Sequence, residues 1–201
     1  MTLKDLKRYL QLKGDKIEQL IRIQMPVIAG QTAVSHFKSN FRQGGFINDG
    51  LQSWPKAKRE GKDKSAGSNY KTLLSGRNHL YGSISYIPGD SSVLIKNDVP
   101  YASIHNEGGT IQSHPTVTPK MRKFAWAKYY EALKVPKGSK VTKNATIPED
   151  ARRWRNLALT KKTKLNIKAV MPKRQFIGES QELTEKLQAK LEQKLEQIIN
   201  H

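Results

Sequence analysis

Histidine is the residue type in this sequence with the widest chemical scope, and the five histidines are scattered: His36, His79, His105, His114 and His201. None has the HxxxH or HExxH spacing that places two zinc ligands on one helical face, and there is no cysteine. His105 and Glu107 form the one close histidine–acid pair of interest. The pair leaves acid–base or metal chemistry open, but Gly108-Gly109 after it favours a histidine that hydrogen-bonds the backbone of a turn.

Carboxylates are too sparse in the central region for metal-dependent nuclease chemistry, which needs several convergent acids. Between residues 64 and 130 the only acids are Asp90, Asp98 and Glu107. Gly44-Gly45 and Gly108-Gly109 lack the spacing of a phosphate-binding loop and are interpreted as turns. The sequence therefore predicts no catalytic residues, no metal site and no cofactor.

Positive charge is the strongest feature of the composition. The net charge is +19, and residues 112–174 hold 17 lysines and arginines against three acids. Such a charge attracts nucleic acid, an anionic membrane or an acidic protein. The candidate contacts to DNA or to an acidic subunit are Lys120, Arg122, Lys123, Arg152, Arg153, Arg155, Lys161 and Lys162.

Aromatic residues accompany this charge at Phe124, Trp126, Tyr129 and Tyr130. Nucleic-acid binding would use such rings to stack on bases. On a helix, however, Trp126, Tyr129 and Tyr130 share one face, while Phe124 points elsewhere. This spacing favours packing within the protein over base stacking.

The elements that must position these residues begin with helices. Leu3, Leu6 and Leu10 have helical spacing, with Thr2 as a candidate N-cap, and Gly14-Asp15 is expected to break the helix. A second apolar stripe runs to residue 41 across Pro26, which predicts two helices or one kinked helix ending at Gly44-Gly45. Trp54 lies in a polar loop over 42–72 and is expected to anchor it to the core.

Alternating residues at 81–87 and 92–96 flank Pro88-Gly89-Asp90 and predict an antiparallel hairpin. Residues 99–105 fit a short helix or an extended segment before the glycine turn. Further helices are expected at 120–133 and 152–159, and a strand at 164–170. The last helix is expected to start at Ser180 or Glu179 and to pack within the subunit by one stripe: Leu183, Leu187, Leu191, Leu195, and Ile198 or Ile199.

The fold class that follows is α+β: a small antiparallel sheet packed against N- and C-terminal helices, with a basic insertion containing one or two helices. We expect residues 1–201 to form a single domain with 112–170 as that insertion. The sequence lacks the apolar run of a signal peptide and the roughly 18 apolar residues of a membrane span. Synthesis in the cytosol, without a membrane partner, is the expectation.

Three short motifs follow one another after the first helices, in an order that is more specific than any of them alone. They are Ser75-Gly76 with Leu80, then Tyr101-Ala102-Ser103-Ile104-His105 with Gly108-Gly109, then Pro172, Arg174, Phe176 and Gly178. This order resembles the phage virion morphogenesis (tail completion) family, which includes Mu-like and P2-like phage proteins. Ser75 replaces the usual threonine, Met171 replaces isoleucine, and three residues separate Gly76 from Leu80 where the family pattern has one.

The resemblance implies a structural protein of the virion and not an enzyme. It implies a role in tail completion and head–tail joining as part of an oligomeric ring, with other neck and tail proteins as partners. The packaged DNA is a further candidate partner for the basic segment, and synthesis would take place in the cytoplasm of the host bacterium. The loops 56–70 and 134–148 are expected to become ordered on assembly.

Two alternatives stay open at the level of sequence. The first is a nucleic-acid-binding protein that uses the basic segment 112–174. The second is a small hydrolase or nuclease that uses His105 and Glu107.

Overall fold

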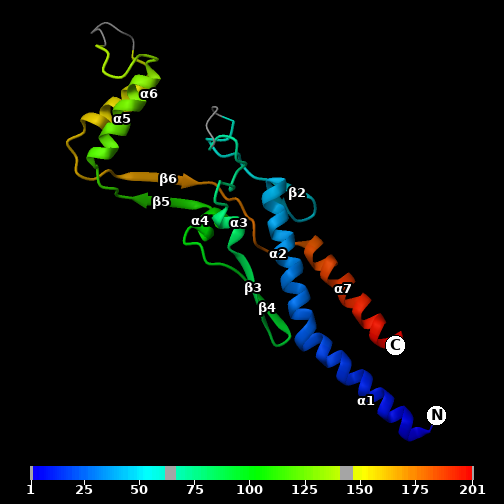
Figure 1. Ribbon diagram of the computed structural model, residues 1–201. Coiled ribbons are helices and arrows are strands. Elements are labelled where there is room, and N and C mark those ends of the chain that lie inside the picture. The colour runs from blue at the N-terminus through cyan, green and yellow to red at the C-terminus, as the bar shows by residue number, and fades with distance from the viewer. Residues whose placement is uncertain (1, 62–66, 141–146, 201) are drawn as a thin grey trace. The chain divides into compact units, whose positions relative to one another are not determined.

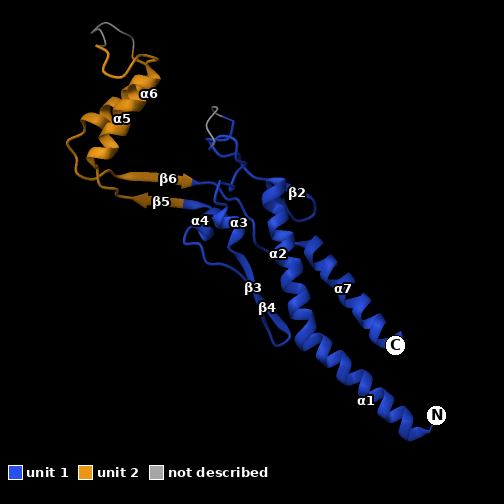
Figure 2. Cartoon of the chain, viewed as in Figure 1, with its two compact units in different colours: residues 1–109, 171–201 blue, residues 110–170 orange. Residues whose placement is uncertain are grey.

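The computed structural model describes residues 2–61, 67–140 and 147–200, and it divides the chain into two compact units (Figures 1 and 2). Unit 1 comprises residues 1–109 and 171–201, and unit 2 comprises residues 110–170. Helices and two-stranded sheets occur together, and long helices stand at both ends of the chain (Figure 1). The α+β prediction with N- and C-terminal helices is therefore confirmed.

Unit 1 begins with one long helical segment. It consists of α1 (Leu3–Gln19), the π-helical turn η1 (Leu20–Gln24) and α2 (Met25–Gln43). Thr2 caps the start as predicted, because its hydroxyl accepts a hydrogen bond from the Asp5 backbone at 3.2 Å. The break predicted at Gly14-Asp15 is wrong. A glycine costs a helix only about 1 kcal/mol, which its neighbours can offset.

Pro26 is accommodated by the π turn and does not end the helix. Proline has no N–H, so the carbonyl of Arg22 four residues earlier lacks its normal helical donor. The backbone N–H of Ser91 takes that place at 3.2 Å. The wider turn and an outside donor together let the helix pass through the proline, so the single-helix alternative is the correct one.

The helix ends at Gly44, whose φ of +75° is the left-handed conformation that closes many helices. The strands β1 (Gly45–Ile47) and β2 (Leu51–Ser53) follow as a short antiparallel pair that the sequence did not predict. Trp54 comes next and is buried, and its indole N–H donates to the Gln175 carbonyl at 2.8 Å. Its predicted role as the anchor of this loop is confirmed.

The predicted hairpin is present as β3 (Ile84–Gly89) and β4 (Ser92–Asn97). Its register pairs Gly89 with Ser92, so Asp90 and Ser91 form the turn. The first strand starts later than predicted, because residues 79–82 form the short helix α3 (His79–Gly82). Of the two alternatives for 99–105, the helix is correct, as α4 (Ala102–Glu107).

The core of unit 1 is built on aromatic rings from distant parts of the chain. Phe41 lies 5.5 Å from Trp54 and 5.1 Å from Phe176 between ring centroids. Further buried apolar side chains complete the cluster: Ala33, Phe37, Phe46, Leu80, Ile84 and Ala102.

The C-terminal helix α7 (Gln181–Asn200) lies beside α2 (Figure 1) and also contacts α1. It starts as predicted, since the Ser180 hydroxyl accepts from the Leu183 backbone at 3.3 Å. The leucine stripe packs inward as expected, and Leu183 contacts the core. No residue of α7 is fully buried, however, so its apolar stripe is only half covered within unit 1.

Unit 2 contains a helical hairpin next to a two-stranded sheet. The strands are β5 (Gly109–Ser113) and β6 (Ile167–Met171), and the helices are α5 (Pro119–Ala132) and α6 (Glu149–Leu159). The two helices and the strand are confirmed, with ends shifted by at most three residues. The helices meet at small residues, because Ala125 and Ala151 are completely buried and Ala158 nearly so. Tyr129 closes the same core.

The ordering on assembly that we expect for loops 56–70 and 134–148 falls partly on 62–66 and 141–146, which lie outside the described residues, and it stays a prediction. Across the described ranges, no helix combines the length and the apolar character of a membrane span.

Candidate functional site

Two of the sequence motifs lie together in unit 1. The backbone N–H of Arg174 donates to the carbonyl of His105 at 2.8 Å. The side-chain oxygen of Asn106 accepts from the backbones of Phe176 and Ile177 at 2.8 and 3.0 Å. Residues 101–109 and 171–178, more than 60 positions apart in the sequence, thus form one hydrogen-bonded cluster.

Arg174 is the buried cation of this motif cluster, with 7% of its surface exposed. Its Nε donates to the Pro55 carbonyl at 2.8 Å, and an Nη donates to the Lys56 carbonyl at 3.4 Å. Burial, and after it the charge of Arg59, lowers the pKa of Arg174. Within residues 2–61, 67–140 and 147–200 it has no carboxylate partner at ion-pair distance. Its contacts hold the segment after Trp54 in place.

His105 does not do what the sequence predicted. Its backbone carbonyl carries the contact to Arg174, while its buried Nδ1 has no hydrogen-bond partner in the part of the chain that is described. The expected bond from the ring to the turn backbone is therefore wrong, and the ring instead packs edge-on against Tyr101 at 5.8 Å. Burial, followed by the nearby charge of Arg174, lowers the pKa of His105.

Glu107 also fails to complete an acid–base pair. Its carboxylate accepts from the Asn106 side chain at 2.5 Å, and it contributes nothing to the pKa shift of His105. Across the described ranges, no group of three or more His, Cys, Asp or Glu side chains is placed to hold a metal ion.

The remaining motif residues occupy turn and core positions. Gly108 has a φ of +74°, and a Cβ there would come within 2.7 Å of the Lys173 backbone, so the close approach of the two motif segments requires glycine. Leu80 and Ala102 are buried in the core, whereas Tyr101 is 46% exposed. Gly76 lies in a turn and Gly178 in a bend, whereas Gly109 begins β5 and Pro172 directly follows β6.

The eight candidate cations of unit 2 divide into two groups. Arg122 donates to the carbonyls of Ala158 and Thr160 and closes the C-terminal end of α6. Arg153 pairs with Glu149 along the same helix at 2.5 Å. The others are exposed and form no ion pair within the described ranges: Lys120, Lys123, Arg152, Arg155, Lys161 and Lys162.

The aromatic residues of unit 2 pack mainly against one another. Tyr129 is buried, and Trp126 lies 5.5 Å from Tyr129 and 6.1 Å from Tyr130 between ring centroids. The predicted packing of these three rings is confirmed. A contact that the sequence did not predict joins Phe124 of α5 to Trp154 of α6 at 5.8 Å, with Phe124 left 53% exposed.

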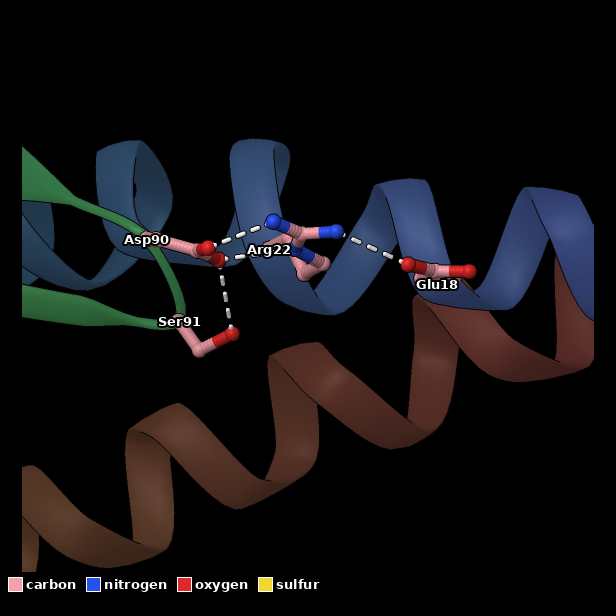
Figure 3. A network of polar contacts seen from close by, with 4 residues as sticks. All are labelled: Glu18, Arg22, Asp90 and Ser91. Carbon is pink, nitrogen blue, oxygen red and sulfur yellow. Dashed lines mark hydrogen bonds and ion pairs between the residues drawn. The ribbon is translucent and has the colours of Figure 1, made fainter.

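A network of ion pairs and hydrogen bonds, which sequence reasoning missed, joins the hairpin tip of unit 1 to the π turn (Figure 3). Arg22 binds both carboxylate oxygens of Asp90, at 2.9 and 2.6 Å, and also binds Glu18 at 2.9 Å. The Ser91 hydroxyl donates to Asp90 at 3.2 Å. Hydrogen bonding to Arg22 lowers the pKa of Asp90, so the carboxylate stays charged at neutral pH.

Comparison with known proteins gives one match. A family model described as the phage virion morphogenesis family matches residues 4–196. No curated protein and no solved structure matches the chain. The matched span includes both the motif cluster of unit 1 and the basic helices of unit 2.

Proposed function

Because this chain belongs to the phage virion morphogenesis family, a family of structural proteins, we propose that it acts in tail completion and head–tail joining as part of an oligomeric ring. The observation that carries the proposal is the length of the match, from residue 4 to residue 196. Its partners are other neck and tail proteins. It is made in the cytoplasm of the host, stays in the virion, and needs neither a cofactor nor a membrane.

The apolar surface of unit 1 supports an oligomer. No residue of α1 is buried, and Leu3, Leu10 and Leu12 are each more than half exposed. Stretches of exposed leucine on a protein of this size mark contact surfaces. In this proposal His105 and Glu107 perform no catalysis, and in the described part of the chain the Glu107 carboxylate bonds to Asn106 and forms no ion pair with His105.

Two measurements test the proposal. Deleting the gene from its phage or prophage is expected to leave DNA-filled heads and tails that do not join, as seen by electron microscopy, and the intact gene should restore joined particles. Native mass spectrometry of the purified protein should show a closed multiple of the 22.8 kDa chain. Joined, infectious particles without the gene would contradict the role in tail completion.

Nucleic-acid binding by the basic segment 112–174 is a second candidate, favoured because six of the eight candidate cations are exposed and form no ion pair with any residue that the structure describes. Replacing Lys123, Arg152 and Arg155 by alanine should lower the slope of log affinity for duplex DNA against log salt by about 1 per lost phosphate contact. The matched control is Arg153→Ala, since Arg153 already pairs with Glu149.

Gel shifts across a salt series provide the measurement. An unchanged slope in the triple variant, or no binding by the parent protein at physiological salt, would exclude DNA. An acidic protein would then be the expected partner of these cations.

A further inference from the structure

The apolar stripe of α1 is covered at one end and bare at the other. Toward its C-terminal end, Ile17 is half-buried and the following Leu20 is 1% exposed. Lys13 donates to the carbonyls of Ile198 and Ile199 at the end of α7, which marks where the cover within unit 1 stops. On the same face beyond that point, Leu3, Leu6 and Leu10 are 88%, 40% and 60% exposed.

A groove of about 730 Å³ lies where η1 and α2 meet the tip of the β3–β4 hairpin. Its apolar wall consists of Ile23, Val27 and Pro88, and Ile23 is 62% exposed. Its rim carries Asp15, Glu18 and Asp90. The Arg22 network in Figure 3 fixes the last two in position.

Charge matches the bare stripe to this groove. The groove carries three carboxylates against the single guanidinium of Arg22, in a chain whose net charge is +19. The bare end of α1 carries Lys4, Lys7 and Arg8 against Asp5. Lys7 lies on the same side as Leu3 and Leu10, four residues after one and three before the other, so leucines and a cation can enter the groove together.

The bare stripe cannot reach the groove of its own chain. Asp15 and Glu18 belong to the same continuous helix as Leu6, and that helix runs without a break through η1 into α2. At about 1.5 Å of rise per residue, Leu6 lies roughly 18 Å along the helix from Glu18 and cannot fold back. The occupant must therefore come from outside the chain, and a second copy supplies both the leucines and the matching charge.

We propose that the N-terminal half of α1 of one copy lies in this groove of a second copy. The inference rests on the proposed ring and names the contact that builds it. Donor helix and acceptor groove are different surfaces of the same chain, so each copy gives one helix and receives one. A head-to-tail contact of this kind closes into a ring when the rotation between copies permits it.

The absence of cysteine allows a direct test with the full-length protein. A mixture of Leu6→Cys and Val27→Cys proteins should form a disulfide-linked dimer under mild oxidation. The double variant should form a ladder of multimers. The matched control is Leu12→Cys mixed with Val27→Cys, which should not cross-link, because Leu12 is 53% exposed on the opposite face of α1.

A second variant tests the contact without chemical linkage. The double variant Leu6→Gln, Leu10→Gln should have the native mass of the single 22.8 kDa chain. The circular dichroism spectrum of the protein should stay unchanged, because the substitutions leave the helix folded. Cross-linking of Leu6→Cys to itself, or in particles to another virion protein, would overturn the proposal. A multimer that persists without cross-linking would refute this contact and leave the ring standing. A monomeric parent protein would refute both.

Discussion

The two units of this chain form their cores in opposite ways. Unit 1 packs large rings from distant segments, with Phe41 in contact with both Trp54 and Phe176. Unit 2 brings two helices together over alanines, with Ala125 and Ala151 completely buried. The charges differ as well, since residues 110–170 hold 15 lysines and arginines against three acids, and the rest of the chain holds 21 against 14.

This difference indicates that the two cores support different surfaces. In unit 1, rings from segments more than 100 residues apart join the motif cluster to α2, because Phe176 packs against Phe41. A core of small side chains lets two charged helices approach closely, which leaves their long cationic side chains on the outside of unit 2. The same contrast predicts that the two cores respond to opposite kinds of substitution.

The largest effect is expected in the core of unit 1. Phe176→Ala should destabilise unit 1 by about 3–5 kcal/mol, because it removes a ring that is 1% exposed and leaves a cavity beside Phe41. Native-state hydrogen exchange, which reports each unit separately, provides the measurement. Phe124→Ala is the matched control, since Phe124 is 53% exposed and should change stability far less. Equal losses from the two substitutions would contradict the assignment of the aromatic core.

Unit 2 should be sensitive to added volume instead. Ala125→Leu should destabilise it by about 1–3 kcal/mol, because the extra carbons have no space where α5 meets α6. Ala127→Leu, two residues further on at an exposed position, is the control and should be nearly neutral. Hydrogen exchange should show the loss in residues 110–170 alone. Lost protection at Phe41 and its neighbours would refute the independence of the two cores.

Local chemistry explains why much of the fold could be predicted from the sequence. The β3–β4 hairpin follows from alternating residues around Gly89, and the start of α7 follows from Ser180 before a leucine stripe. Trp54 could be recognised as an anchor because a tryptophan in a polar loop has few other roles. Each of these signals is complete within about 20 residues of sequence.

The features that could not be predicted depend on partners far away in the chain. The helix passes Pro26 because Ser91, 65 positions later, supplies the missing donor to Arg22. From the sequence alone Arg122 is predicted as a surface cation, but in the fold it donates to the carbonyls of Ala158 and Thr160 at the end of α6. The sequence could therefore identify basic residues but could not tell a helix-closing arginine from an exposed one.

The smallest expected effect is a dependence of stability on pH, which we expect in unit 1 and not in unit 2. His36 in unit 1 is 4% exposed and lies 3.0 Å from the Ser180 hydroxyl, and burial together with the charge of Lys186 lowers its pKa. As the pH falls through about 6.5, the ordinary pKa of histidine, the unfolded chain therefore binds more protons than the folded chain does. The contribution of His36 to stability is therefore complete above that pH and declines below it. Among its described residues unit 2 holds no buried histidine, so the stability of unit 2 should show no decline of this origin.

Tryptophan fluorescence can follow the two units separately in denaturant, because Trp54 lies in unit 1 while Trp126 and Trp154 lie in unit 2. A Trp126→Phe, Trp154→Phe variant should lose stability between about pH 7 and pH 5, where histidine titrates. The Trp54→Phe variant should report no such loss. Adding His36→Gln, which keeps a polar group beside Ser180, should flatten the unit 1 profile. A profile that stays equally steep would assign the dependence to the half-buried His105, whose pKa is lowered by burial and then by the charge of Arg174.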